Sequence, residues 1–172
     1  MIIHFNDGLA DAVSDIIIRG VRLNDRERIV KAFRELDRSS VYRRFFFHKK
    51  EPKDEELRRV TECDGVSHAV LVATVGSGDR EIIVGLGEYV RSGAAADIAF
   101  AVEEDFQGRG IASRLLQQLT DIARANGILQ FEADVLAENA PMLAVLRNSG
   151  LRMLTSHEQG VIHATLFLTE RG

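Results

Sequence analysis

The spacing of apolar residues predicts that the chain opens with a strand followed by a helix. Three consecutive isoleucines begin residues 16–22, and such a β-branched run is typical of a strand. The next apolar residues recur at helical spacing, at Ile29, Val30, Phe33 and Leu36. Asn24 or Asp25 stands where the N-cap of this helix belongs. A second, shorter helix is predicted over 55–60, after Pro52.

Farther along the chain, β-branched and apolar stretches alternate with turn residues. Each of these stretches is predicted to be a strand: 67–75, 81–91, 97–102, 128–136 and the two halves of 151–168. The turns of the hairpins contain glycine, at 76–79, 93–96 and 159–160. Two longer stretches, 109–126 and 139–148, have helical spacing, and Gly127 ends the first of them. The order predicts an α+β fold in which antiparallel hairpins surround one βαβ crossover.

Composition and charge restrict the classes of protein to which the chain can belong. Its 172 residues suit one domain, with 1–14 as an N-terminal extension and 15–172 as the domain itself. A formal net charge of −4 provides no basic surface, so nucleic acid is not expected as a partner. No apolar stretch approaches the roughly 20 residues that span a bilayer, and no secretory leader is recognisable. We therefore expect a soluble, cytoplasmic protein with no membrane partner.

Residues 102–113 carry the most informative pattern, two closely spaced glycines between a predicted strand and a long helix. Free N–H groups and the helix dipole make a helix start a site for anions, and glycine lets a phosphate approach the backbone. Arg109 and Arg114 can add positive charge. A Walker loop is absent, and Ser113 stands where a dinucleotide fingerprint wants glycine or alanine. The pattern predicts a phosphate site and weakens both nucleotide interpretations; an ordinary glycine turn is the structural alternative.

The segment from Gln107 to Ala112 matches the Gln/Arg-x-x-Gly-x-Gly/Ala pattern of the GNAT superfamily of N-acetyltransferases. Asn139 and the pair Gly150-Leu151 resemble that family's asparagine-containing helix and the turn after it. The resemblance implies a GNAT fold, a mixed and mostly antiparallel sheet of about six or seven strands with about four helices. It also implies that strands four and five splay apart to form a cleft for acetyl-CoA.

By this resemblance, acetyl-CoA is the cosubstrate, and the amides from Gly108 to Ser113 bind its pyrophosphate. The pantetheine arm would pair with the fourth strand, where a bulge would free one N–H for the thioester oxygen. Asn139 would contact the CoA arm or serve as a helix N-cap. The predicted cofactor-binding residues are Phe100, Ala101, Val102, Gln107, Gly108, Arg109, Gly110, Ile111, Ala112, Ser113 and Asn139. A less specific likeness, over 36–46, is to the GNAT domain of bacterial protein lysine acetyltransferases.

Acetyl transfer to an amine requires a group that takes up the proton of the amine. Asp97 corresponds to the catalytic glutamate of the protein-acetylating branch of the family, and strand alternation places it beside two small alanines. Glu88 on the preceding strand is the alternative base. Each carboxylate also has a structural interpretation, Asp97 as a solvated group at a hairpin end and Glu88 as a charge partner of Arg91 or Arg80.

The residue that protonates the leaving thiolate is missing from its family position. Seven residues after Asn139, where many members carry tyrosine, stands Leu146. The two tyrosines of the chain, Tyr42 and Tyr89, could replace that acid or could simply pack. Water or direct departure of the thiolate can also serve, because a thiolate is a fair leaving group.

Two other chemistries lack support in the sequence. Cys63 is the single cysteine, which excludes a disulfide within the chain, and it has no histidine close in sequence to activate it. The five histidines lack ligand spacing, so no metal is predicted.

The sequence therefore predicts an N-acetyltransferase that moves an acetyl group from acetyl-CoA to a primary amine by direct attack in a ternary complex. The acceptor is an amine on a protein lysine or on a small molecule. A module that senses acyl-CoA with little turnover is the alternative. The identity of the amine, the length of the acyl group and the formation of a homodimer stay open.

Overall fold

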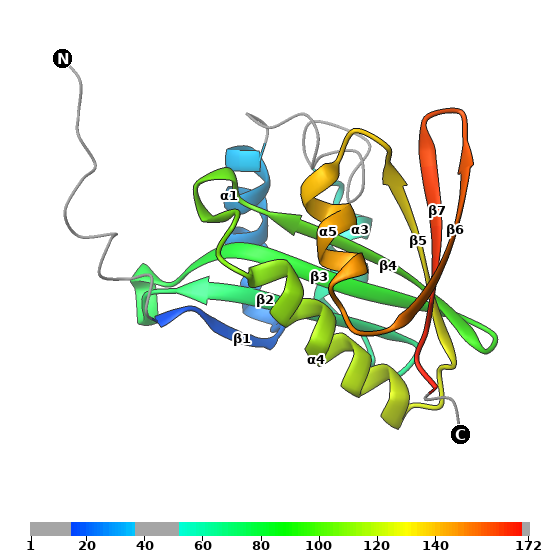
Figure 1. Ribbon diagram of the computed structural model, residues 1–172. Coiled ribbons are helices and arrows are strands. Elements are labelled where there is room, and N and C mark those ends of the chain that lie inside the picture. Colours follow the sequence, from blue (N-terminus) through cyan, green and yellow to red (C-terminus); the bar gives the residue numbers. More distant parts are fainter. Residues whose placement is uncertain (1–14, 37–51, 170–172) are drawn as a thin grey trace, which may run out of the picture.

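The computed structural model describes residues 15–36 and 52–169, which form one seven-stranded sheet with helices on both faces (Figure 1). The strands lie in the order β1-β2-β3-β4-β5-β7-β6. Every neighbouring pair is antiparallel except β4 and β5. The strands are β1 (Ile17–Gly20), β2 (His68–Val75), β3 (Ile82–Ser92), β4 (Ala95–Val102), β5 (Gln130–Leu136), β6 (Arg152–Glu158) and β7 (Val161–Phe167). The predicted α+β class and the sheet of six to seven strands are confirmed.

The α-helices of the described ranges divide between the two faces of the sheet. They are α1 (Arg26–Leu36), α3 (Asp54–Thr61), α4 (Ile111–Ala125) and α5 (Ala140–Arg147). Figure 1 shows α4 and α5 on one face and α1 and α3 on the other. The larger buried cluster packs under α4 and α5 and includes Leu115 and Leu119. A smaller cluster, with Ile29 and Val60, lies under α1 and α3. Burial of these apolar faces is the main force that holds each helix against the sheet.

The β4-α4-β5 crossover places the start of α4 against the centre of the sheet. Gly85 of β3 makes this approach possible, because a Cβ there would lie 2.9 Å from Cγ2 of Ile111, the first residue of α4. A larger residue at this position would push the first turn of α4 away from the sheet. The glycine thus fixes the place of the helix start, where the sequence predicts the phosphate site.

β4 and β5 are paired at one end only. Their register joins Ala95–Asp97 to Gln130–Glu132, and neither strand pairs with the other beyond those residues. Both strands continue, β4 to Val102 and β5 to Leu136. They therefore separate, which confirms the splay expected of strands four and five.

Most other predicted elements are present, some with shifted ends. The strand predicted from Asp97 begins at Ala95, because the turn needs only Gly93 and Ala94. The helix predicted from Arg109 begins at Ile111. The turn at 159–160 is confirmed by left-handed φ angles at both residues. The aromatic segment 41–47 and the extension 1–14 lie outside the described residues.

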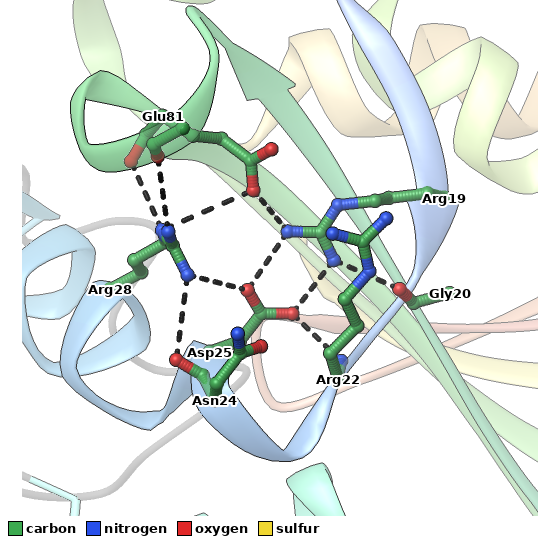
Figure 2. Close-up of polar contacts among 8 residues, drawn as sticks. Arg19, Gly20, Arg22, Asn24, Asp25, Arg28 and Glu81 are labelled. Carbon is green, nitrogen blue, oxygen red and sulfur yellow. Dashed lines mark hydrogen bonds and ion pairs between the residues drawn. The ribbon is translucent and has the colours of Figure 1, made fainter.

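A buried ion-pair network ties β1 to the start of β3 through the short 3₁₀ helix η2 (Leu23–Asp25), as Figure 2 shows. The Asp25 carboxylate is fully buried and accepts hydrogen bonds from Arg19 Nη1 at 2.7 Å and from Arg19 Nη2 at 2.8 Å. Arg19 also donates to Glu81, next to β3. Arg28 of α1 lies 3.6 Å from the same aspartate. The network therefore joins β1, α1 and β3 in one charged cluster.

Asp25, one of the two residues predicted as the cap, takes part in a capping box at the start of η2, which leads directly into α1. Its Oδ2 accepts a hydrogen bond from the N–H of Arg22 at 2.7 Å, on the side of η2 away from α1. Burial alone would raise the pKa of Asp25, but the hydrogen bonds from Arg19 and from the Arg22 N–H outweigh it and hold the pKa below its usual value. The carboxylate is consequently ionised at neutral pH and binds its arginine partners.

Candidate functional site

Both glycines of the loop between β4 and α4 adopt the left-handed conformation. Gly108 has φ 75° and Gly110 has φ 77°. Residues with a Cβ are strained there, whereas glycine is not. A Cβ on either residue would meet nothing within 4 Å. Backbone conformation, rather than packing, therefore requires glycine, and the loop is open on the side where a ligand would approach.

The first turn of α4 has no side-chain cap. Its N-cap is Gly110, and the first intrahelical bond runs from the N–H of Arg114 to the Gly110 carbonyl at 3.0 Å. The three preceding N–H groups, of Ile111, Ala112 and Ser113, have no acceptor within the helix. Together with the positive end of the helix dipole they form a group of donors suited to an anion.

A cavity of about 310 Å³ lies at this helix start, between the loop, α4 and α5. Its lining residues are Val102, Phe106, Gln107, Gly108, Gly110, Ile111, Ala112, Ser113, Pro141, Met142, Ala144, Val145 and Asn148. Most of the predicted cofactor-binding residues are among them. Gln107 is fixed at the rim because its Nε2 donates to the Val102 carbonyl at 3.2 Å. The structure thus brings the predicted loop residues together around one hollow.

The two arginines of this region do not line the cavity. Arg109 is exposed, and its guanidinium carbon lies 5.1 Å from the centroid of the Phe106 ring. Arg114 donates from Nη2 to the Ile16 carbonyl at 3.1 Å. Both lie within about one turn of the helix start, so their charges strengthen the positive potential there without direct contact.

The free side of β4 presents backbone groups to the gap between β4 and β5. The Ala94 carbonyl accepts a bond from the β5 side, and the Glu103 N–H donates to β3. Since backbone direction alternates along a strand, the N–H and C=O groups of Phe100 and Val102 face the gap. Those of Ala101 face β3, so Ala101 offers no backbone donor to the gap. Phe100 and Val102 are therefore the predicted strand residues placed to pair with an extended ligand.

The bulge expected in β4 is absent. β3 and β4 pair without a shift from Gly85–Val102 to Ser92–Ala95. The irregularity of the sheet lies instead between β2 and β3, at Ala73 and Thr74. The unpaired N–H groups of β4 arise because β5 turns away, and no extra residue in β4 is needed.

The splay itself encloses a small gap of about 20 Å³. It is lined by Ile98, Ala99, Phe100, Ala133, Asp134, Val135, Met142 and Leu146. Leu146 stands in the tyrosine position of the family, is 1% exposed, and has no proton to donate.

Tyr89 does not replace the missing acid. It is fully buried in the core under α4, on the face opposite Glu88, and its hydroxyl donates to the Val66 carbonyl at 3.0 Å. Burial raises the pKa of Tyr89 above its usual value. Tyr42 lies outside the described residues. Tyr89 therefore packs, as one of the two interpretations of this residue predicts.

Asn139 is the N-cap of α5, which is one of the two roles predicted for it. Its Oδ1 accepts a hydrogen bond from the N–H of Met142 at 3.2 Å, and the residue is 2% exposed. Its Nδ2 is buried and has no hydrogen-bond partner. Buried donors without a partner are rare because each costs the desolvation of a polar group. The capped α5 therefore carries a donor that a ligand carbonyl would satisfy.

Asp97 and Glu88 lie on one face of the sheet, the face of α1 and α3. Glu88 is opposite Ala99, and Val90 is opposite Asp97. Opposite residues of antiparallel strands point to the same side of the sheet, and so do residues two apart along one strand. Glu88 and Asp97 are therefore diagonal neighbours on one face, with their backbone positions roughly 7 Å apart. The structure thus brings both predicted catalytic candidates to one place.

The surroundings of the two carboxylates differ. Asp97 is exposed and has no hydrogen bond or ion pair within the described residues. Glu88 is 6% exposed, with Oε2 2.6 Å from Nε2 of His68 and Oε1 3.8 Å from Nη2 of Arg59. The expected charge partners, Arg91 or Arg80, are therefore wrong. His68 and Arg59 were not anticipated as parts of the site.

Other acidic groups continue this face toward β7. Glu132 is the register partner of Asp97 and accepts a hydrogen bond from Thr165 Oγ1 at 2.7 Å. Asp134, two residues on, lies 2.5 Å from Nδ1 of His163. The open face beside Asp97 is consequently acidic, which suits a cationic molecule.

Among residues 15–36 and 52–169 there is no group of three or more His, Cys, Asp or Glu side chains that could hold a metal ion. Burial raises the pKa of the Cys63 thiol, which disfavours the reactive thiolate. No helix of the described parts is long and apolar enough to cross a membrane.

The fold and the glycine loop together define a GNAT-type acetyltransferase. The family model described as the acetyltransferase (GNAT) family matches residues 31–151, and the chain belongs to this family. Acetyltransferase Pat of Mycolicibacterium smegmatis is 33% identical over 136 residues, which are 77% of this chain and 40% of that protein. The chain therefore spans less than half the length of this relative.

Solved structures agree with this family. The GNAT domain of S. lividans PAT is 31% identical, with a TM-score of 0.77 over 88% of this chain and 90% of that chain. YncA of Salmonella typhimurium, solved with its cofactor acetyl-CoA, is 18% identical, with a TM-score of 0.70 over 91% of this chain and 95% of that chain. At that identity the likeness concerns the fold alone. The predicted resemblance to the family and to the GNAT domain of protein acetyltransferases is confirmed.

Proposed function

We propose that the chain is an N-acetyltransferase that binds acetyl-CoA at the start of α4. The observation that carries the proposal is the uncapped helix start opening onto the 310 Å³ cavity. The N–H groups of residues 111–113 would hold the pyrophosphate. Phe100 and Val102 would pair with the pantetheine arm, and Asn139 would donate to it from the buried Nδ2. When bound, acetyl-CoA supplies the activated acetyl group as a thioester.

Asp97 is the group best placed to accept the proton of the amine. Its carboxylate is exposed, unpaired within the described residues, and stands where β4 begins to leave β5. A general base must reach its proton directly or through one water. Aspartate is one methylene shorter than glutamate, so a bridging water would complete the distance.

Glu88 acts in this proposal as a fixed negative charge. His68 and Arg59 already occupy its two oxygens, at 2.6 Å and 3.8 Å. A carboxylate so engaged is held in one orientation and cannot turn freely toward a substrate. It would stabilise the positive charge of the incoming amine beside Asp97.

The acceptor in this proposal is a primary amine on a protein lysine or on a small molecule. A protonated amine is a cation, and the face beside Asp97 carries Glu132 and Asp134 as well. Similarity to Acetyltransferase Pat supports acetyl transfer as the reaction. A cytoplasmic location remains part of the proposal.

The test is a thiol-release assay with acetyl-CoA and a panel of amines that includes lysine-containing peptides, free amino acids and polyamines. The wild type should release CoA in an amine-dependent manner, with one acetyl group found on the acceptor for each CoA by mass spectrometry. Release of CoA that no amine accelerates would contradict the proposal.

A second candidate function is an acyl-CoA-binding sensor with little turnover. Leu146 favours it, since no proton donor stands at the family position beside the gap. Calorimetry and turnover separate the two functions. Tight binding of acetyl-CoA without transfer to any amine of the panel would favour the sensor.

A further inference from the structure

The gap between β4 and β5 continues the cavity at the start of α4. Met142 lines both the 310 Å³ cavity and the gap of about 20 Å³, so the two spaces meet at this side chain. The cavity reaches β4 at Val102, and the gap lies beside residues 98–100 of the same strand. A ligand that enters at the helix start and follows the free side of β4 therefore ends in the gap.

The pantetheine arm of acetyl-CoA has the right length for this path. Its extended chain of amide groups spans roughly 15 Å, the length of about four to five residues of a strand. Val102 and Ile98 are four residues apart on β4, which is about 13 Å at the usual rise of a strand. With the pyrophosphate at the N–H groups of 111–113, the thioester at the other end of the arm would lie at the gap.

The gap has an apolar side, toward α5, and an open side, toward the face of Asp97. The apolar side chains come from β4, β5 and α5 and belong to the larger core cluster: Ile98, Phe100, Ala133, Val135, Met142 and Leu146. Ala99 and Asp134 also line the gap, and strand alternation places them on the face of Asp97. The chain of an acyl group would therefore turn toward α5, whereas the amine approaches from the face of Asp97.

Leu146 forms the far wall of this apolar side. Met142 and Leu146 lie four residues apart on α5, about one helical turn, so they share the face of the helix that covers the gap. Met142 borders the 310 Å³ cavity as well, whereas Leu146 lines only the gap and is 1% exposed. The Phe100 ring is held over β3, because a Cβ on Gly87 would lie 3.0 Å from two of its carbons. Leu146 is therefore the side chain that an acyl group longer than acetyl would meet.

We propose that Leu146 limits the length of the acyl group, as the wall of an acyl pocket between β4 and β5. The gap of about 20 Å³ has room for about one small group, such as the methyl of an acetyl group. A propionyl group brings one more methylene against a close-packed wall, and a well-packed core resists such overpacking. The inference rests on the proposed transfer reaction. There the amine nitrogen bonds to the carbonyl carbon, the C–S bond breaks, CoA leaves as the thiolate, and Asp97 takes up the proton of the amine.

The test compares acetyl-CoA, propionyl-CoA and butyryl-CoA as donors for the wild type, Leu146→Ala and Leu143→Ala. Leu143 is the matched control, because it is buried on the same helix and lines neither the cavity nor the gap. The wild type should prefer acetyl-CoA over propionyl-CoA by about tenfold or more in kcat/KM, the usual effect of one methylene. Leu146→Ala should lower this preference by at least about tenfold and accept butyryl-CoA, whereas Leu143→Ala should keep it. A preference that is the same in all three proteins, or that both variants lose equally, would overturn the proposal.

Calorimetric affinities for the same three acyl-CoAs provide a readout that needs no turnover. The affinity for propionyl-CoA relative to acetyl-CoA should rise in Leu146→Ala and stay unchanged in Leu143→Ala. If the wild type transfers no acyl group to any amine, the proposed function fails, and these affinities alone decide on the acyl pocket. Leu146→Val is the milder variant if circular dichroism shows that Leu146→Ala is unfolded, and it should shift the relative affinity in the same direction. Equal relative affinities in the wild type and in every folded variant would contradict the pocket.

Discussion

Nε2 of His68 lies 2.6 Å from Oε2 of Glu88, and this contact separates the roles of two acidic residues on the same sheet face. Glu88 is buried and held by His68 and Arg59, whereas Asp97 is exposed and unpaired among the described residues. In the proposed mechanism, Asp97 is therefore the carboxylate that takes up the proton of the amine. This assignment makes the two residues experimentally distinguishable.

Replacement of Asp97 by asparagine should lower kcat/KM by roughly 10²- to 10⁴-fold, the usual contribution of a general base. The affinity for acetyl-CoA should stay within about twofold, because Asp97 lies outside the 310 Å³ cavity. Steady-state kinetics and calorimetry measure the two quantities. An unchanged kcat/KM would show that the amine arrives neutral and that positioning suffices.

Glu88→Gln is the matched variant, because glutamine keeps an oxygen that can accept from His68. We expect kcat/KM to fall by less than about tenfold, since only the charge beside the amine is lost. The fall should appear mainly as a higher KM for the amine. If Glu88→Gln shows the large loss and Asp97→Asn does not, the roles of the two residues are reversed.

The place of Glu88 could not be predicted from the pattern of the hairpin. Counting outward from the turn, where Val75 pairs with Ile82, would set Glu88 opposite Ala69 and into the core under α4. The register shift at Ala73 and Thr74 moves Glu88 opposite Val70 and turns it to the other face. One extra residue in a strand changes the face of every side chain beyond it. The contact with His68 follows from that shift and has no local signal.

Asn139→Ser should separate the capping role of Asn139 from its proposed ligand contact. Serine caps a helix about as well as asparagine, so the free energy of unfolding should change by less than about 0.5 kcal/mol. The buried Nδ2 donor is lost, and the affinity for acetyl-CoA should fall by about three- to tenfold, the value of one neutral hydrogen bond. Calorimetry and urea unfolding test both statements. An unchanged affinity would leave Asn139 as a cap alone.

Asp25→Asn should destabilise the protein in a pH-dependent way. The pKa of Asp25 is lowered in the fold, so its stabilisation is complete above the unfolded value of about 3.9 and is lost as the pH falls through the folded pKa. At pH 7 the variant should be less stable than the wild type by about 3 kcal/mol, because the buried Arg19 loses one of its two carboxylate partners and keeps only Glu81. Urea unfolding should show that the difference in the free energy of unfolding between the wild type and the variant narrows below about pH 4. A difference in stability that is the same at all pH values would contradict a stabilising role of the Asp25 charge.

The glycine loop was predictable because its signal is local. Two glycines between a strand and a helix specify a left-handed turn and an uncapped helix start, and both are present at Gly108 and Gly110. The splay of β4 from β5 followed from the family resemblance. The unpaired Nδ2 of Asn139 could not be foreseen, since it depends on how α5 packs. Local chemistry was thus visible in the sequence, whereas contacts made by packing and by register were not.

The most direct test of the account is a calorimetric titration of acetyl-CoA into the wild type, Gly110→Asp and Gly93→Asp. Both glycines have a left-handed φ and open space around them, so the two substitutions impose similar backbone strain. Gly93 lies in the β3-β4 turn, away from the cavity. The account predicts one acetyl-CoA bound by the wild type and by Gly93→Asp, with an affinity at least about tenfold weaker in Gly110→Asp, where a carboxylate opposes the pyrophosphate. Equal affinities in all three proteins, with the variants folded, would contradict binding at the start of α4.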